Sequence, residues 1–317
     1  MAKATSDIRV RDIRLTLTGR AGGLSQCSPA DPCPSASPSA AGGQTMQTRA
    51  IPSTCEALPT VGLGTYRAFD AAPGDPLHRP LPAVLGELFN KGGTVIDSSP
   101  MYGRAEETVG GLLSIHEPRS PAFLATKVWT RGREEGIAQM ERSLHLLRTD
   151  CIDLMQIHNL LDWQTHLPTL RDWKARGRIR YIGITHYAPS AHDEVEAVLK
   201  AEQVDFLQIN YALDDRAVEK RILPLCRERG VAVICNRPFG GGALLERLRG
   251  RPLPGWASQV QVTSWPQLLL KFLLAHPAVT CVIPGTGNPR SMADNAGAGF
   301  GLTLTDAQRQ QLIALVG

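Results

Sequence analysis

The stretch FLATKVWTRGREEGIAQMERSLHLLRTDCIDLMQIH, residues 123–158, holds the unit from which we predict the fold. A short apolar run, Phe123–Lys127, leads through a turn into the segment Glu134–Leu147, and a second apolar run, Ile152–His158, follows. Within the middle segment the apolar stripe at helical spacing consists of Ile137, Met140, Leu144 and Leu147. Neither apolar run alternates cleanly with polar residues, as expected for strands buried on both faces. The stretch therefore predicts a strand, an amphipathic helix and a second strand.

This unit recurs from Ala57 onward, at intervals of roughly 25 to 35 residues. Further amphipathic helices are predicted at Ala191–Leu199 and Ala217–Arg229. Glycines stand between a helical stretch and the next strand, where a C-terminal cap belongs, at Gly92, Gly177 and Gly230. The eight predicted strands are Val61–Thr65, Thr94–Asp97, Phe123–Lys127, Ile152–His158, Ile179–Thr185, Phe206–Asn210, Val231–Cys235 and Val279–Ile283.

Strand–helix alternation with parallel crossovers is typical of an open doubly wound sheet or of a closed barrel. Eight units favour the α/β class with a (β/α)8 TIM barrel. An open sheet usually carries G-x-G-x-x-G after its first strand, whereas Gly62-Leu63-Gly64-Thr65-Tyr66 leads into no such helix. We expect the segment Thr48–Pro59 to form a hairpin that closes the barrel floor.

The first residues of the chain differ in composition from the rest. Residues 25–44 are rich in Ser, Pro, Ala and Gly and show no apolar periodicity. The apolar run before them is short and interrupted by Thr16 and Thr18, unlike an export signal. We predict that residues 1–45 are a disordered extension, a degraded leader or a mis-start, and that residues 46–317 form the barrel. A cytoplasmic location follows, with export to the periplasm as the alternative.

Composition excludes several classes of function. The net charge of +4 over 317 residues is small, and the basic residues are scattered, so no nucleic-acid partner is predicted. The apolar runs are too short to span a bilayer. Seven cysteines have spacings that match no metal site, and free thiols are the favoured interpretation over a disulfide framework. The sequence does not indicate the oligomeric state of the protein.

Polar side chains end the predicted strands, at the end of a barrel where active sites lie. Asp97 ends the second strand and precedes Tyr102, Lys127 ends the third, and His158 ends the fourth. Each has a structural explanation alone: a helix cap, a snorkelling lysine, a packed tyrosine, a satisfied core histidine. Together they suit proton transfer, since an ammonium lowers the pKa of a nearby tyrosine and a carboxylate offsets burial of that ammonium. A histidine can orient a substrate carbonyl.

These residues resemble the aldo-keto reductase family over nearly all of residues 49–317. The resemblance is carried by GLGTY from Gly62, VIDSSPMYGRAEETVGGLL from Val95, ATKVW from Ala125, DLMQIHNL from Asp153, RYIGITHY from Arg180, LQINY from Leu207, and AVTCVIPGT through ADN from Ala278. It implies a barrel that reduces aldehydes or ketones to alcohols by hydride transfer. It also implies a catalytic tetrad in which Tyr102 is the general acid, Lys127 lowers its pKa, Asp97 pairs with Lys127, and His158 positions the carbonyl.

The resemblance further implies an NADPH site, with NADH possible. Gln208 matches the family pattern, Thr185 keeps a hydroxyl, His186 replaces an amide, and Asn236 stands where a stacking tyrosine is common. Gly285 and Ser291 replace two cations that commonly bind the 2′-phosphate, and Arg290 is the candidate substitute. The expected cofactor-binding residues are Gly64, Thr65, Tyr66, Thr185, His186, Gln208, Asn236, Arg237, Pro238, Phe239, Thr286, Arg290, Asp294 and Asn295.

Two regions have open interpretations. Gly240–Ser264 is a long connection with three arginines, either a flap over the cofactor or a solvated surface loop. Trp129, Asn159 and Leu160 follow strand ends and are the predicted substrate pocket, although Trp129 and Leu160 suit plain packing as well.

Two other functions stay open from the sequence. Lys127 as a Schiff-base nucleophile would give a hydrolase or aldolase, but a lysine paired with Asp97 is a poor nucleophile. A non-catalytic or weakly catalytic NADPH-binding barrel with a regulatory or redox-sensing role is the other alternative.

Overall fold

The structure is a computed structural model, and it describes residues 45–115 and 122–316. The predicted extension, residues 1–45, lies almost entirely outside the described residues, so its boundary stays a prediction.

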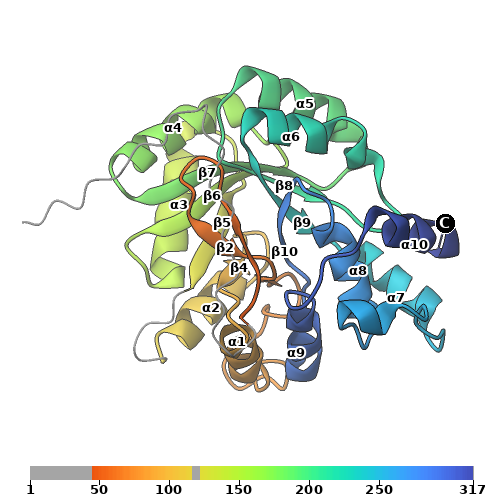
Figure 1. Cartoon of the computed structure of the whole chain (residues 1–317). Coiled ribbons are helices and arrows are strands. Elements are labelled where there is room, and N and C mark those ends of the chain that lie inside the picture. The colour runs from red at the N-terminus through yellow and green to blue at the C-terminus, as the bar shows by residue number, and fades with distance from the viewer. Residues whose placement is uncertain (1–44, 116–121, 317) are drawn as a thin grey trace, which may run out of the picture. The chain divides into compact units, whose positions relative to one another are not determined.

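Eight parallel strands form one sheet in the order β10-β9-β8-β7-β6-β5-β4-β3. Parallel bridges between Val61 and Val282 and between Gly64 and Gly285 join its two edges, which closes the sheet into a barrel. The predicted (β/α)8 barrel is confirmed (Figure 1). The strands are β3 Leu63–Gly64, β4 Val95–Asp97, β5 Phe123–Val128, β6 Ile152–His158, β7 Ile179–His186, β8 Phe206–Asn210, β9 Ala232–Asn236 and β10 Val279–Val282.

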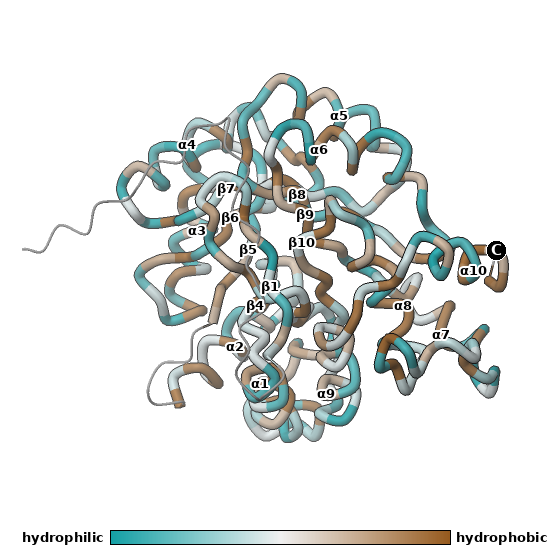
Figure 2. Tube along the Cα trace, in the orientation of Figure 1, coloured by the Kyte–Doolittle hydropathy of each residue, from teal (hydrophilic) through white to brown (hydrophobic). Residues whose placement is uncertain are grey.

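Helices cover the outside of the barrel, and apolar residues gather on the strands inside them (Figures 1 and 2). The predicted stripe of the Glu134–Leu147 helix faces the core, with Met140, Leu144 and Leu147 buried and Ile137 packed against them. The helices are α1 Leu81–Asn90, α2 Ala105–Leu113, α3 Arg133–Leu147, α4 Trp163–Ala175, α5 His192–Ala201, α6 Ile222–Arg229, α7 Ala243–Leu248, α8 Trp265–Leu274, α9 Pro289–Gly297 and α10 Asp306–Val316.

Two predicted segments differ from the structure. Ala217–Arg229 is a 3-10 turn, Ala217–Glu219, followed by α6, rather than one helix. Pro224 lies in the first turn of α6, where its missing N–H costs no helical hydrogen bond, and this favours a helix that begins at Ile222. The long connection Gly240–Ser264 contains α7, in which Leu244 and Leu248 are buried.

A hairpin closes the floor of the barrel, as the sequence predicts. Strand β1, Thr48–Ala50, pairs antiparallel with β2, Ala57–Pro59. Ile51 and Leu58 are buried among the side chains that point into the barrel. The other members of this interior cluster are Val95, Phe123, Ala125, Leu154, Tyr181, Phe206, Ala232, Ile234, Cys281 and Ile283. The lower barrel is therefore a packed core, and the polar residues lie above it.

Candidate active site at the carboxyl end of the barrel

Strand alternation brings polar side chains together above the apolar interior. On β5 the residues Phe123 and Ala125 face the interior, so Lys127 faces it too, because side chains two positions apart share a face. The same alternation on β4, β6, β7, β8 and β9 adds Asp97, Gln156, His158, Thr185, Gln208 and Asn236. These residues form the polar layer at the carboxyl end of the barrel.

Asp97 and Lys127 form a buried ion pair. Lys127 Nζ donates to both carboxylate oxygens of Asp97 at 2.8 Å and to the carbonyl oxygen of Ser98 at 2.7 Å. Both side chains are almost completely buried. Burial lowers the pKa of Lys127, but the charge of Asp97 and the proximity of Tyr102 raise it more, so its pKa lies above the ordinary value. Lys127 is therefore a fixed ammonium, which disfavours a nucleophilic role.

Tyr102 lies in the loop between β4 and α2, directly beside this ion pair. Lys127 Nζ is 5.1 Å from the centroid of the Tyr102 ring. Burial raises the pKa of Tyr102 more than the nearby Lys127 lowers it, and Asp97 raises it further. Lys127 thus lowers the pKa of Tyr102, as predicted, but burial outweighs this effect and the net shift is upward. Tyr102 is protonated at neutral pH.

His158 lies next to Tyr102, and the two ring centroids are 6.1 Å apart in an edge-on arrangement. Its Nδ1 atom forms a 3.2 Å hydrogen bond with Ser99 Oγ. Burial lowers the pKa of His158 to about 3, and the charges of Lys127 and His186 contribute in the same direction. A neutral imidazole oriented by Ser99 can donate or accept a hydrogen bond, depending on its tautomer.

Aromatic side chains border the open carboxyl end of the barrel beside Tyr102 and His158, which we call the mouth. Tyr66 is about half exposed, and its ring centroid is 5.0 Å from that of Tyr102. Trp129, also exposed, has its ring centroid 6.2 Å from that of His158. Asn159 follows His158 with a left-handed backbone, whereas Leu160 is buried in the main core cluster. Of the predicted substrate pocket, Trp129 thus borders the mouth and Leu160 packs inside.

The predicted nicotinamide contacts lie on neighbouring strands. Thr185 of β7 and Gln208 of β8 are register partners, and both are buried. His186 Nδ1 accepts a hydrogen bond from the backbone N–H of Ala188 at 3.1 Å. Asn236 ends β9, and its Oδ1 atom is buried without a hydrogen-bond partner among the described residues.

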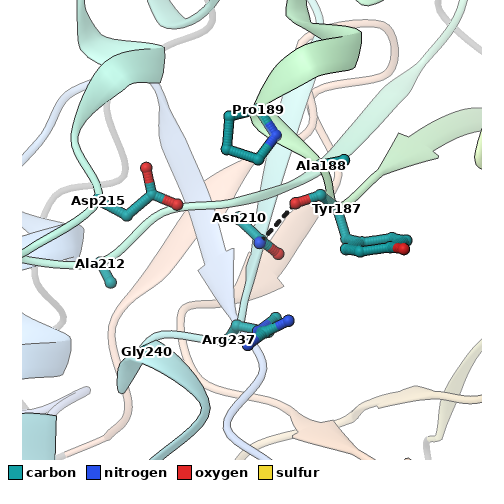
Figure 3. A pocket seen from close by; sticks show the side chains of 8 residues that line it. All are labelled: Tyr187, Ala188, Pro189, Asn210, Ala212, Asp215, Arg237 and Gly240. Carbon is teal, nitrogen blue, oxygen red and sulfur yellow. Dashed lines mark hydrogen bonds between the residues drawn. The ribbon is translucent and has the colours of Figure 1, made fainter. Parts of the chain in front are cut away.

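A cavity of about 300 Å³ opens beside these residues, at the ends of β7, β8 and β9 (Figure 3). Tyr187, Asn210 and Arg237 line it, and Asn210 Nδ2 donates to the carbonyl oxygen of Tyr187 at 2.7 Å. Pro238 is buried, and Phe239 packs against the core. The structure therefore places Arg237 at the cavity and Phe239 against the core.

Gly64 and Thr65 lie where the barrel closes. A Cβ atom on Gly64 would lie 3.0 Å from the carbonyl oxygen of Ile283, so a glycine permits the close approach of the two strands. Thr65 Oγ1 donates to the carbonyl oxygen of Asp97 at 2.9 Å. This bond ties the loop after β3 to the strand that carries Asp97.

The predicted adenosine side is arranged around α9. Asn288 caps this helix by accepting from the backbone N–H groups of Arg290 and Ser291, and Thr286 Oγ1 accepts from the N–H of Asn288. The Arg290 side chain is exposed, and Asn295 is buried. The Asp294 carboxylate accepts from Ser264 and Gln267, which ties α9 to α8. Contacts of these residues with a cofactor stay a prediction.

Two of the three arginines of the Gly240–Ser264 connection lie near acidic groups. Arg249 pairs with Glu246 one turn away, and Arg247 lies 3.8 Å from Asp214. These exposed pairs agree with a solvated surface.

The family model described as the aldo/keto reductase family matches residues 60–316. The chain belongs to the aldo/keto reductase family. It is 28% identical to a methylglyoxal reductase of Escherichia coli over 71% of this chain and 80% of that protein. It is 26% identical to an NADH-specific methylglyoxal reductase of the same organism over 79% of this chain and 92% of that protein.

A crystal structure of an aldo/keto reductase from Klebsiella pneumoniae, in complex with NADP and acetate, matches this reductase with a TM-score of 0.71. The identity is 26%, and the match covers 86% of this chain and 95% of that chain. The chain is thus an oxidoreductase with the fold of its family.

Sequence reasoning did not find two polar residues of the reductase's site, Ser99 and Gln156. Ser99 contacts His158, and Gln156 Nε2 donates to Asp97 Oδ1 at 3.1 Å. A signal for Gln156 was present, because it interrupts the apolar run of β6 two positions before His158 and so shares its face. Ser99 gave no such signal, because loop geometry decides where its hydroxyl points.

In the described part of the reductase, no group of three or more His, Cys, Asp or Glu side chains is arranged to hold a metal ion. None of the helices within residues 45–115 and 122–316 is long and apolar enough to cross a membrane. Cys151, Cys226, Cys235 and Cys281 are free thiols, as the sequence predicts. Cys55 is disulfide-bonded, so the prediction of free thiols is wrong for this residue.

Proposed function

We propose that the protein reduces an aldehyde or ketone to an alcohol with NADPH or NADH, and that Tyr102 is the general acid. The observation that carries this proposal is the buried Lys127 ammonium, which contacts the Asp97 carboxylate and lies 5.1 Å from the centroid of the Tyr102 ring. A phenol, a fixed positive charge and a neutral histidine thus share one end of the barrel, which supports proton transfer from Tyr102.

The residues at the ends of β7, β8 and β9 fit a nicotinamide nucleotide. The buried and unpaired Oδ1 atom of Asn236 can accept from an amide or hydroxyl group, and Arg237 at the cavity suits a phosphate. Thr185 and Gln208 lie beside each other and would hold the carboxamide. One structural relative is in complex with NADPH, and one sequence relative is named NADH-specific, which supports both cofactors as candidates.

Each of the four residues Asp97, Tyr102, Lys127 and His158 has a distinct role in the proposed reaction. The bound reduced cofactor would supply the hydride to the carbonyl carbon. His158 donates a hydrogen bond that orients the carbonyl oxygen, and Tyr102 transfers its hydroxyl proton to that oxygen. Lys127 stabilises the resulting phenolate, and Asp97 keeps Lys127 charged and in place.

The test measures consumption of the reduced nicotinamide by its absorbance. Purified protein receives NADPH or NADH and a panel of aromatic and aliphatic aldehydes that includes methylglyoxal, because two relatives are named for it. We expect carbonyl-dependent oxidation, with kcat about 10² to 10⁴ lower in Tyr102→Phe, because the phenyl ring keeps the shape and removes the proton.

Binding of the cofactor is measured separately by quenching of protein fluorescence. If wild-type protein binds NADPH but oxidises it with none of the carbonyls, the reductase proposal is wrong and the regulatory, cofactor-binding barrel is supported. If Tyr102→Phe retains the wild-type kcat, another group is the proton donor.

A further inference from the structure

Gln156 is a buried polar residue in the interior of the barrel, and the interior side chains beneath it are apolar. It lies on β6 between Leu154 and His158, shares their interior face, and has no exposed surface. Its register partner on β5 is Lys127, and its partner on β7 is Gly183. Gln156 therefore lies directly beneath the substrate mouth and next to the ion pair.

One end of the Gln156 amide is bonded and the other is not. Nε2 donates at 3.1 Å to Asp97 Oδ1, the same oxygen that accepts from Lys127 Nζ. Oε1 is buried and has no hydrogen-bond partner among the described residues. The reversed amide would place an oxygen against the carboxylate, so the charge of Asp97 fixes the orientation.

The neighbouring strand makes room for this side chain. A Cβ atom on Gly183 would lie 2.9 Å from Gln156 Cγ, closer than ordinary van der Waals contact. An apolar residue of similar size would fill the same space and leave no buried acceptor unpaired. Packing alone therefore does not account for a glutamine here, whereas its bond to Asp97 does.

We propose that Gln156 is a positioning residue for the reduction, which holds Asp97 Oδ1 and thereby fixes the Asp97–Lys127 pair beside Tyr102. This inference rests on the proposed function. The amide N–H offsets part of the carboxylate charge and prevents Asp97 from turning away from Lys127. Without it, the negative charge of Asp97 acts more strongly on Tyr102, which raises the pKa of the phenol and weakens it as an acid.

The experiment replaces Gln156 by Met, which keeps the length of the side chain and removes both polar atoms. We expect kcat at neutral pH to fall about tenfold, with KM changed less than about twofold, because Gln156 lies below the substrate. The alkaline limb of the kcat profile moves to higher pH. Leu154→Met, on the same face of the same strand, is the matched control and keeps the wild-type profile.

A double-mutant cycle with Asp97→Asn tests whether Gln156 acts through Asp97. We expect Gln156→Met to have little further effect when the carboxylate is absent. An equal loss of kcat in both backgrounds, an unmoved alkaline limb, or a loss confined to KM overturns the proposal.

A readout without turnover separates this inference from the proposed function. The ultraviolet titration of Tyr102 is the difference between wild-type protein and Tyr102→Phe, and it requires no substrate. We expect Tyr102 to ionise at higher pH in Gln156→Met. If wild-type protein reduces no carbonyl, this titration still decides the role of Gln156, and identical titrations in the two proteins overturn it.

Discussion

His158 gives the protein a dependence of stability on pH. In the folded state its pKa is about 3, mainly because of burial. In the unfolded chain a histidine has a pKa of about 6.5. As the pH falls below that value, the unfolded state binds the proton and the folded state does not. The contribution is therefore favourable above about pH 6.5 and is lost progressively toward pH 3.

His158→Gln should flatten this dependence, because glutamine can still bond to Ser99 but cannot titrate. Between pH 6.5 and 4.5 we expect wild-type protein to lose about 2 kcal/mol more unfolding free energy than the variant loses. Urea denaturation at several pH values measures both slopes. Parallel slopes would mean that His158 takes up its proton over the same pH range in the folded protein as in the unfolded chain.

Single residues were predictable where the chain direction already fixed their place. Asp97, Lys127 and His158 end strands, so a barrel brings them to one rim whatever the details of packing. The sign of the Tyr102 pKa shift was not predictable, because it depends on the balance between burial and the Lys127 charge. The hydrogen bonds of Asp294 were not predictable either, because its partners on the preceding helix are about thirty residues away in the sequence.

Among the elements, the floor hairpin has a function in stability that is separate from the active site. Ile51, directly after β1, is fully buried and belongs to the interior cluster with Phe123, Tyr181 and Phe206. Glu56, in the hairpin turn, accepts a hydrogen bond from Tyr181 Oη and pairs with Arg180. The hairpin thus fills and seals the end of the barrel opposite the mouth.

Ile51→Ala should lower the free energy of unfolding by about 2–5 kcal/mol, because the cavity forms in a rigid interior. Urea denaturation measures the loss, and Leu77→Ala, at a side chain that is 67% exposed, is the control with little effect. Equal losses in the two variants would contradict the assignment of Ile51 to the core.

The boundaries of helices and strands were predictable where apolar periodicity is strong. They were less predictable where a proline influences the start of a helix. All eight strands overlap their predicted ranges, because each buries an apolar run. The single helix predicted over Ala217–Arg229 is wrong because Pro224 sets where α6 begins. In the Gly240–Ser264 connection, three consecutive glycines indicated a loop, and the short helix α7 that follows them was not predicted. Its apolar face consists of only two residues, Leu244 and Leu248, which is too few to show helical periodicity.

At the scale of the whole molecule, the barrel has one weak seam. Strand β3 has only two residues, and two isolated bridges, one at Val61 before the strand and one at Gly64 within it, join this edge to the other. The backbone N–H groups of Gly62 and Val282 donate across this seam, to Val282 and Thr60 respectively. By contrast, β6 and β7 are paired from Ile152 to His158.

Amide hydrogen exchange should report this difference. We expect Gly62 and Val282 to exchange at least about tenfold faster than Met155 and Ile182 at the centre of β6 and β7, because short pairings open locally at lower cost. Native-state exchange followed by NMR measures each site. Uniform protection around the barrel would show that the seam opens only with global unfolding.

Apolar side chains fill the barrel beneath Gln156, from Leu154 down to Ile51 and the hairpin. Within the described residues, the route between Tyr102 and bulk water therefore runs through the mouth, which in the proposed reaction would also admit the substrate. In the proposed reaction the alcohol must leave before the phenolate is reprotonated. Each cycle would then end in a fixed order: the alcohol leaves first, and the Tyr102 phenolate takes up a proton second, both through the same opening.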